Sequence, residues 1–372
     1  MSRAGTRAVV DLGALAANHA RLRARAGGRE LIAVVKADAY GHGAEAVVRR
    51  LAREGCRWFA VARVAEVAAL RRAGLDVPLL VLGGVAGPAE ARAALALRAT
   101  AVVQAPEQVG WLEEAARSLG TPARVHVEID TGMRRLGVPA EQAPALLARV
   151  TGSRWLALEG VCTHLACADE PDLAPTRAQL DCFRKTLAAA RAAGVDPGRV
   201  HVANSAGILV AAGAADLAEG DAVRPGLALY GVAPAPHLAD PELRPVMTLC
   251  TEVAAVRPVA EGDGVGYGHT WRAPRAGWIA VLPLGYADGI PWSAASRGSV
   301  VIDGVRHPLA GRVSMDCITV WTGERPARIG EPALVFGAEP APRVEEWAQA
   351  AGTIAYELMV RVGTRVPRVV EG

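Results

Sequence analysis

Lys36 follows an apolar run at residues 31–35 and comes shortly before a Tyr-Gly-His-Gly turn at residues 40–43. The β-branched composition of the run predicts a buried strand with the lysine at its end. Partial removal from water lowers the pKa of an amine and makes it a candidate nucleophile. The alternative is a surface lysine that simply ends a strand, and for Lys36 taken alone this alternative is the stronger. The rest of the chain reverses that balance.

Other polar side chains that could take part in chemistry also follow predicted strands. They include carboxyl, guanidinium, imidazole, amide and hydroxyl groups. Barrels of the (β/α)₈ type build their active sites in this way, from the carboxyl ends of several strands. In chain order these residues are Asp130, Arg135, His164, Asn204, Ser205 and Arg224.

Strands and helices alternate regularly around these residues. Strands alternating with helices predict right-handed crossovers and a parallel sheet. A doubly wound open sheet is the alternative, but it would gather functional residues at one switch point. Because the polar residues follow many strands, we predict an α/β fold with a (β/α)₈ TIM-like barrel. Strands are predicted to begin near residues 31, 57, 78, 100, 124, 156, 200 and 222, with helices at 12–25, 44–53, 64–73, 89–97, 107–119 and 176–193.

Beyond residue 236 the pattern changes to β-branched runs separated by prolines. Asp303-Gly304 lies between two such runs and indicates a two-residue hairpin. We therefore predict a barrel domain at residues 1–236 and a mostly antiparallel β domain at 237–372, with one helix at about 344–351. Residues before about 11 are left free to pair with the second domain.

Charge and cysteine spacing exclude several classes of protein. The 41 basic and 38 acidic residues leave a net charge of +3, which gives no reason to expect a nucleic-acid or membrane partner. Neither a signal peptide nor a membrane span is predicted. The six cysteines are scattered, without the paired spacing of a zinc site. We expect a cytoplasmic protein with no bound metal.

Eight short motifs resemble, in order, those of the alanine racemases, which are pyridoxal-phosphate enzymes built from a barrel and a β domain. One match would carry little weight, but eight in order make the resemblance specific, and the resemblance runs from about residue 7 to the end. The motifs are AVVKADAYGHG at 33–43, DTGM at 130–133, THLA at 163–166, NS at 204–205, RPG at 224–226, GYG at 266–268, GYADG at 285–289 and GRVSMD at 311–316.

The resemblance implies a pyridoxal 5′-phosphate site in the barrel. Lys36 would form an imine with the cofactor aldehyde and then act as a base on one face. Barrels commonly hold a phosphate on the loops after strands seven and eight, where Ser205 lies. A plain helix N-cap is a compatible role for Ser205. The residues expected around the phosphate are Tyr40, Asn204, Ser205, Gly226, Leu227 and Tyr356.

Arg224 resembles the family residue that faces the pyridine nitrogen. A guanidinium does not give up its proton, so it would leave that nitrogen unprotonated and limit side reactions. A structural ion pair is the alternative for Arg224. The resemblance places His164 beside the cofactor ring in a hydrogen-bond chain with Arg224, and His201 behind that chain.

Tyr267 resembles the second base of the family, supplied by the other subunit of a homodimer opposite Lys36. Inverting a centre in both directions needs a proton donor and acceptor on each face, which two residues provide. The alternative is a β-turn with an incidental aromatic residue.

Substrate contacts are also implied. Arg135 would hold the substrate carboxylate, with the Met315 backbone amide of the other subunit. Tyr286 and Tyr356 would narrow the entrance and favour a methyl side chain. Arg312 and Asp316 belong to the same motif at this entrance.

The chain departs from the family pattern at two positions. Many members carry a carboxylated lysine where this chain has Glu128, whose shorter stem would leave its carboxylate roughly 3–4 Å short. We expect a water or anion to bridge Glu128 to Arg135, or Arg135 to shift, with His126 on the same strand face as a further participant and no dependence on bicarbonate. Trp292 replaces an arginine of the access corridor.

We therefore predict a pyridoxal-phosphate-dependent racemase that interconverts L- and D-alanine. A serine or broader-specificity racemase stays open. An amino-acid decarboxylase and a pyridoxal-phosphate carrier are the remaining alternatives.

Overall fold

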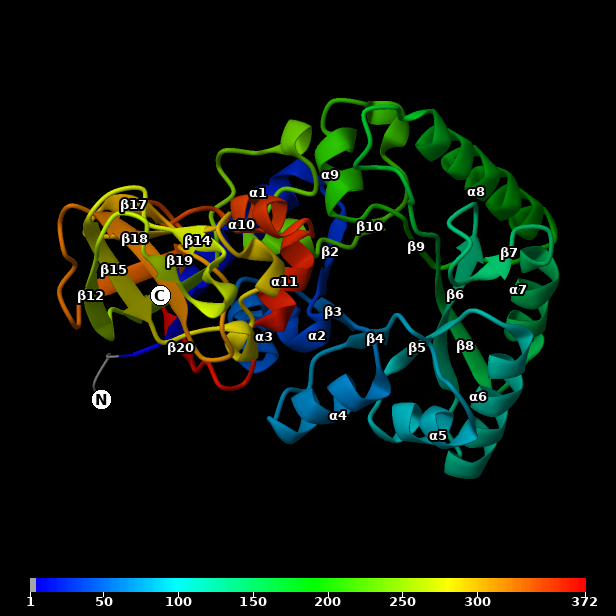
Figure 1. Cartoon of the computed structure of the whole chain (residues 1–372). Helices are drawn as coiled ribbons and strands as arrows, with labels where there is room; N and C mark the ends of the chain where they lie inside the picture. The colour runs from blue at the N-terminus through cyan, green and yellow to red at the C-terminus, as the bar shows by residue number, and fades with distance from the viewer. Residues whose placement is uncertain (1–4) are drawn as a thin grey trace.

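Residues 5–372 are described in the computed structural model, and eight parallel strands form a closed barrel (Figure 1). The ring closes because β5 pairs with β6 as well as with β4. An open doubly wound sheet would leave two unpaired edges, so the predicted (β/α)₈ barrel is confirmed. The strands are β2 (Glu30–Val34), β3 (Trp58–Val61), β4 (Leu79–Val81), β5 (Thr100–Val103), β6 (Ala123–Asp130), β8 (Leu156–Cys162), β9 (Arg199–His201) and β10 (Ala222–Val223), with the short β7 (Val138–Pro139) beside β6.

The barrel strands are continuous apolar runs because both of their faces are covered. Every residue of β3, β4 and β5 is buried, as parallel strands between a core and surrounding helices must be. The covering helices are α1 (Leu12–Arg25), α3 (Ala44–Arg53), α4 (Val64–Arg72), α5 (Pro88–Ala96), α6 (Pro106–Leu119), α7 (Ala143–Gly152), α8 (Ala174–Ala192) and α9 (Ser205–Ala211).

The C-terminal part of the chain, together with the first strand, forms a β domain. One sheet has the order β17-β16-β19-β11-β1-β20, and β12-β15-β18 and β13-β14 form smaller sheets. Every pairing is antiparallel except that of β1 with β20, which confirms the predicted fold class. The strands are β1 (Arg7–Asp11), β11 (Met247–Glu252), β12 (Ala255–Val259), β13 (Gly264–Val265), β14 (Trp271–Arg272), β15 (Gly277–Leu282), β16 (Ser299–Ile302), β17 (Val305–Pro308), β18 (Ile318–Gly323), β19 (Pro332–Phe336) and β20 (Arg368–Glu371).

Strands β16 and β17 form the hairpin predicted at Asp303-Gly304. Ile302 pairs with Val305 across the turn. Asp303 and Gly304 have φ values of 50° and 72°, which is what a two-residue turn of this kind requires.

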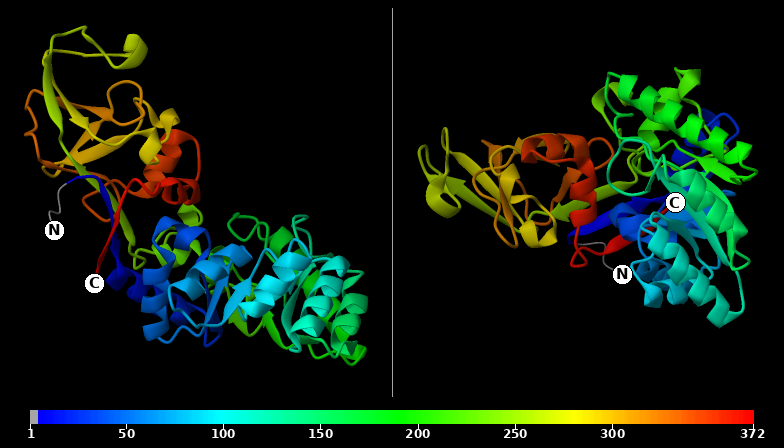
Figure 2. Two further views of the ribbon diagram at one scale, coloured as in Figure 1. Left: turned by 90° about the horizontal axis from the view of Figure 1, so that it is seen from below. Right: turned by 90° about the vertical axis from the view of Figure 1, so that its right-hand side faces the viewer.

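Two helices of the β domain lie between its sheets and the barrel (Figure 2). Helix α10 (Val344–Ala351) has the predicted bounds, whereas α11 (Ala355–Arg361) was not predicted. Helix α11 packs against α2 (Lys36–Gly41) at the barrel mouth. Across residues 5–372, no helix combines the length and the apolar character needed to cross a bilayer.

Candidate active site

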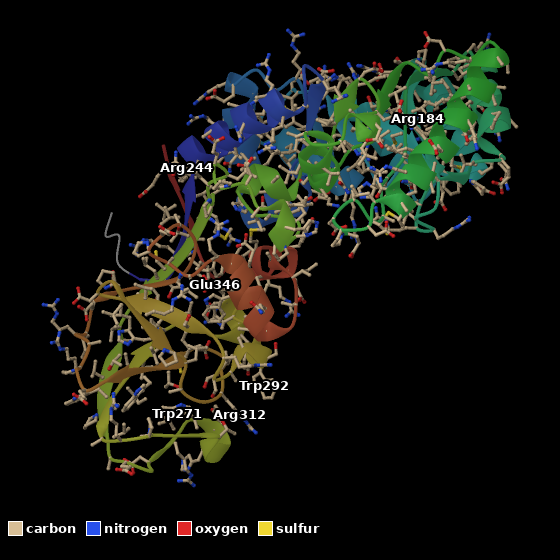
Figure 3. All side chains as sticks on the ribbon, turned by 90° about the horizontal axis from the view of Figure 1, so that it is seen from above. Arg184, Arg244, Trp271, Trp292, Arg312 and Glu346 are labelled. Atoms are coloured by element: carbon tan, nitrogen blue, oxygen red, sulfur yellow. The ribbon has the colours of Figure 1, made fainter. Side chains whose placement is uncertain are left out.

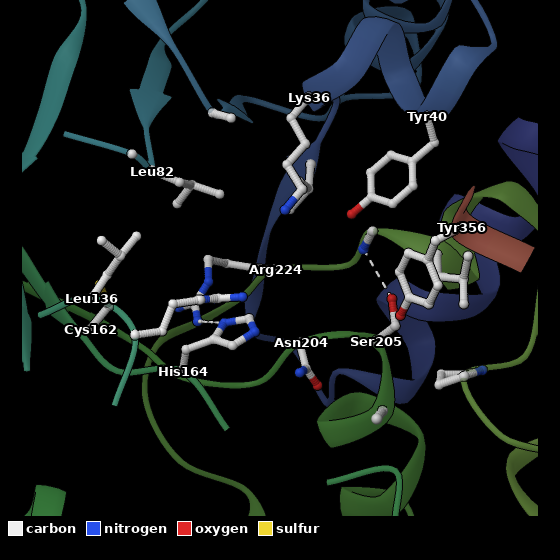
Figure 4. Close-up of a pocket in the computed structure, with 18 of the residues that line it drawn as sticks. Lys36, Tyr40, Leu82, Leu136, Cys162, His164, Asn204, Ser205, Arg224 and Tyr356 are labelled. Atoms are coloured by element: carbon white, nitrogen blue, oxygen red, sulfur yellow. Dashed lines mark hydrogen bonds between the residues drawn. The ribbon is translucent and has the colours of Figure 1, made fainter. Parts of the chain in front are cut away.

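A cavity of about 570 Å³ opens at the carboxyl ends of the barrel strands (Figure 4). Its walls come from β6 and β8, from the turn or loop after β2, β9 and β10, and from α11 of the β domain. The tertiary fold therefore brings together residues that are far apart in the sequence. The predicted site residues that line the cavity are Lys36, Tyr40, Glu128, Arg135, His164, Asn204, Ser205, Arg224, Gly226, Leu227 and Tyr356.

Lys36 begins the turn α2, whose backbone is left-handed. The residues from Ala37 to Tyr40 all have φ between 52° and 55°. Each non-glycine residue in this region costs roughly 1–2 kcal/mol, so contacts from outside must hold the turn. The turn presents the Lys36 amine and the Tyr40 phenol to the same cavity (Figure 4).

Glu66, on α4, supplies such a contact. One carboxylate oxygen accepts a hydrogen bond from the Ala37 backbone N–H (2.5 Å), and the other accepts from the N–H groups of Ala62 (2.7 Å) and Arg63 (2.9 Å). Hydrogen bonds to a charged acceptor are among the stronger ones. Gly41 ends the turn at a φ of 82°, where an added Cβ would lie 2.3 Å from a backbone carbonyl oxygen of α11.

The Lys36 amine lies among positive charges. Burial lowers the pKa of Lys36 from its ordinary value, and the guanidinium groups of Arg135 and Arg224 lower it further, while the Glu66 carboxylate opposes them. A lowered pKa leaves more of the amine in its neutral, nucleophilic form near neutral pH. This favours a chemical role over a surface lysine.

Arg224 is buried in the cavity floor and is held by hydrogen bonds. One guanidinium nitrogen donates to Nδ1 (2.6 Å) and to the backbone oxygen (2.7 Å) of His201. The other donates to the carbonyl oxygens of Thr163 (2.7 Å) and Val202 (2.9 Å) and lies 3.3 Å from Nδ1 of His164. A guanidinium has no acceptor, so both histidines accept at Nδ1 and carry their proton on Nε2.

His126 extends this chain away from the cavity. Its Nδ1 lies 2.7 Å from Nε2 of His201, so it accepts the proton that His201 donates. His126 bonds to His201 and not to Glu128, which corrects the expected partnership with that carboxylate. Burial lowers the pKa of His126 and of His164 to about 3 and that of His201 well below its ordinary value, and nearby arginines add to the effect.

The other end of the cavity carries hydroxyl groups and backbone amides. Ser205 Oγ accepts hydrogen bonds from the N–H groups of Gly226 (3.0 Å) and Ala228 (3.1 Å). The N-cap of α9 is Asn204, whose side-chain oxygen accepts from the Gly207 N–H (2.9 Å). The expectation that Ser205 is an N-cap is therefore wrong, because Ser205 is the first residue of the helix.

Two phenols face the same end. The ring centres of Tyr40 and Tyr356 are 6.1 Å apart. Burial raises the pKa of Tyr40 well above its ordinary value and that of Tyr356 to about 12, so both keep an O–H that can donate. Gly226 leaves room for them, since an added Cβ would lie 2.4 Å from Tyr40 Oη.

Glu128 and Arg135 line the cavity without touching each other. Within residues 5–372, Arg135 forms no ion pair and donates no hydrogen bond. Glu128 Oε2 instead accepts a hydrogen bond from the Gln104 side-chain amide (2.8 Å), which also donates to the Leu82 carbonyl oxygen (2.7 Å). The expected bridge between Glu128 and Arg135 stays a prediction.

Apart from Tyr356, the predicted residues of the β domain lie outside this cavity. Tyr267 begins the short turn η4 (Tyr267–His269) and is 70% exposed, and Met315 is 53% exposed. Tyr286 and Trp292 are also largely exposed.

Arg312 lies within this exposed surface. Its guanidinium is 5.9 Å from the centre of the Trp292 ring (Figure 3), and it lies beside Gly268, next to Tyr267. Asp316 pairs with Arg365 (2.8 Å). The Arg312 guanidinium thus lies between the loop of Tyr267 and Trp292, one of the two positions that depart from the family pattern.

Comparison with known proteins decides the family. Residues 10–234 match the model "Alanine racemase, N-terminal domain" and residues 246–370 match "Alanine racemase, C-terminal domain". The chain belongs to the alanine racemase family. The predicted resemblance and enzyme class, an isomerase, are therefore confirmed.

Individual relatives extend this finding over the whole chain. The alanine racemase of Streptomyces coelicolor is 42% identical over 98% of this chain and 95% of its own length, and that of Thermobifida fusca is 39% identical over 98% and 97%. The crystal structure of alanine racemase from D-cycloserine producing Streptomyces lavendulae superposes with a TM-score of 0.95 at 39% identity, covering 100% of this chain and 98% of that one.

Sequence reasoning missed several residues that hold the site of this family member together. Glu66 and Gln104 are described above. Gln179, on α8, donates to the His164 carbonyl oxygen (3.0 Å) and to Thr131 Oγ1 (3.2 Å) and so joins two loops at the rim. Glu66 had a local signal, an acidic residue at the third position of a helix. The two glutamines had none, because their partners are distant in the sequence.

Proposed function

We propose that this chain racemises alanine with pyridoxal 5′-phosphate, in a homodimer whose two active sites each use residues of both subunits. The observation that carries the proposal is the Lys36 amine, which has a lowered pKa and shares one cavity with an arginine floor and a hydroxyl-lined end. The relatives named above are alanine racemases, which supports alanine as the substrate.

The residues of the cavity fit pyridoxal 5′-phosphate. The volume of the cavity is that of a small-molecule site, and Gly226 leaves space that a Cβ would fill. Lys36 would hold the aldehyde of the cofactor, and Arg224 would contact its ring nitrogen. The hydroxyl groups of Ser205, Tyr40 and Tyr356 would bind its phosphate. When bound, the cofactor supplies an aldehyde for the amine and a ring that delocalises the electrons of a deprotonated carbon.

Lys36 would move the proton on one face of the reacting carbon. Arg224 would donate a hydrogen bond to the nitrogen it faces without giving up its proton, because a guanidinium stays protonated. Its contacts with His201 and His164 hold it in place. Less electron density is then withdrawn from the reacting carbon, so reprotonation is favoured over side reactions.

Tyr267 of the partner subunit would move the proton on the opposite face. Its 70% exposure in the single chain and its distance from the cavity lining support a position completed only by assembly. Met315, Tyr286 and Trp292 are exposed in the same domain, and their burial against a second barrel mouth would stabilise the dimer. The entrance would then admit a small side chain.

Arg135 would bind the substrate carboxylate, joined by the Met315 backbone amide of the partner subunit. Its guanidinium lines the cavity and has no protein acceptor among the described residues. With Glu128 as a built-in anion in the same cavity, we expect a rate that added bicarbonate does not change. The unpaired state of all six cysteines accords with a cytoplasmic location.

Mixing two inactive variants tests the shared site. Lys36→Ala and Tyr267→Phe homodimers are each expected to lose alanine racemisation. Random exchange of subunits makes half of the dimers mixed, and each mixed dimer has one intact site, so activity returns to about one quarter of wild type. If both residues act within one subunit, mixing restores nothing. Serine in the same assay measures the breadth of the substrate range.

A further inference from the structure

Gln104 follows strand β5 directly and is almost fully buried. Its side-chain nitrogen donates to the carbonyl oxygen of Leu82 (2.7 Å) and to Oε2 of Glu128 (2.8 Å). Both neighbours are acceptors, so both amide hydrogens are used and the orientation of the amide is fixed. If the amide were rotated by 180°, its oxygen would face the Leu82 carbonyl and the Glu128 carboxylate, which are both acceptors.

Gln104 is itself held by the next turn of the chain. Its backbone N–H donates to Oε1 of Gln108 (2.6 Å), and the Gln108 side-chain nitrogen donates to the Val85 carbonyl oxygen (3.0 Å). These bonds tie the end of β5 to the loop after β4. The Gln104 amide is therefore a rigid donor built into the barrel.

Glu128 is left with one oxygen for the cavity. Its Oε2 accepts the hydrogen bond from Gln104. Its Oε1 accepts no hydrogen bond from the described residues and is not fully covered by protein, so it remains accessible. Arg135 lines the same cavity without a protein acceptor. Because both side chains line one cavity, a carboxylate held at one oxygen and open at the other can act on the Arg135 guanidinium through water.

We propose that Gln104 is a positioning residue, which fixes the Glu128 carboxylate as the counter-charge of Arg135 and thereby sets the affinity of the site for a substrate carboxylate. This inference rests on the proposed function, in which Arg135 binds the substrate carboxylate. Gln104 touches neither substrate nor cofactor and acts through Glu128.

Propionate binding to the holoenzyme, measured by calorimetry, tests this proposal. Gln104→Leu should raise the Kd of propionate and the KM of both alanine enantiomers on the order of tenfold, with kcat nearly unchanged, because one charge-assisted hydrogen bond is lost. In a Glu128→Gln background the same substitution should change neither constant further. Any loss of folding stability from the unpaired Leu82 carbonyl should appear in both backgrounds.

Gln104→Glu adds a readout that a purely structural role would not move. The two facing carboxyl groups of this variant would share a proton at low pH and repel each other once both are ionised. Propionate affinity relative to wild type should therefore be nearly normal at low pH and fall as pH rises.

Three results would overturn the proposal. They are an unchanged propionate Kd in Gln104→Leu, an equal loss of propionate affinity from Gln104→Leu in the wild-type and Glu128→Gln backgrounds, and a loss of propionate affinity in Gln104→Glu that does not vary with pH. If wild type binds propionate in the predicted Gln104-dependent way but does not racemise alanine, the proposed function fails and this inference stands. If wild type racemises alanine and Gln104→Leu alters only stability, the inference alone fails.

Discussion

Lowering the pH from 7 to 5 should destabilise this protein steeply, because His42, His126 and His201 are buried as neutral rings and His164 is partly buried at the cavity. Burial lowers the pKa of His42 to about 4 and those of His126 and His164 to about 3, and it places the pKa of His201 well below its ordinary value. In the unfolded chain each would titrate near 6.5. Below that pH the unfolded state binds more protons, so stability is present above pH 6.5 and is lost as pH falls toward the folded-state pKa.

The magnitude follows from linkage. Between pH 7 and pH 5, a histidine that stays neutral when folded and has an unfolded pKa of 6.5 costs about 2 kcal/mol. His42, His126 and His164 together therefore cost about 6 kcal/mol, and His201 adds to this. Since whole domains are stable by roughly 5–15 kcal/mol, the loss is comparable to the total.

Denaturant unfolding at pH 7, 6 and 5, at one protein concentration, measures this slope. His126→Gln keeps an acceptor for His201 and should reduce the slope between pH 6 and 5 by up to about 1.4 kcal/mol per pH unit. His237→Gln removes an exposed histidine and should leave the slope unchanged. A total loss below about 2 kcal/mol, or equal effects of the two substitutions, would refute the reasoning.

Substitutions at three positions around the cavity give further predictions. Glu66→Gln turns one acceptor into a donor facing a backbone N–H, so it should cost about 2–3 kcal/mol in thermal unfolding; it should also lower the pKa of Lys36 in pH-dependent amine acylation of the apoenzyme, and an unchanged titration would contradict the role of Glu66. Gly226→Ala should displace the Tyr40 hydroxyl and weaken cofactor binding in equilibrium dialysis about tenfold; an unchanged Kd would mean that the phenol is not needed there. Ser205→Ala leaves two backbone N–H groups without their acceptor and should weaken cofactor binding by about tenfold or more, whereas Ser205→Thr keeps the hydroxyl and should retain most of the affinity; equal Kd values for the two variants would contradict the role of the hydroxyl.

Local patterns were sufficient for most of the secondary structure. Asp303-Gly304 fixes its hairpin because only residues that tolerate positive φ can form so short a turn. Continuous apolar runs specify buried parallel strands, and each predicted barrel strand begins within one residue of the observed start. Helix α11 was missed because it is short and follows α10 closely.

Long-range contacts are what local patterns do not contain. Gln104 and Glu128 meet only because β5 and β6 close the barrel, and Tyr356 reaches Tyr40 only because α11 packs on α2. The left-handed turn after Lys36 is unfavourable by itself, so its conformation depends on Glu66 from another element.

By itself, the sequence determined the order of strands and helices, the closed barrel and the residue types available for chemistry, because these follow from periodicity, turn chemistry and motifs. Only the tertiary structure decided which carboxylate bonds to which amide, which histidine carries which proton and which face of the β domain is left exposed. These depend on distances between segments far apart in the chain, which no local free energy specifies.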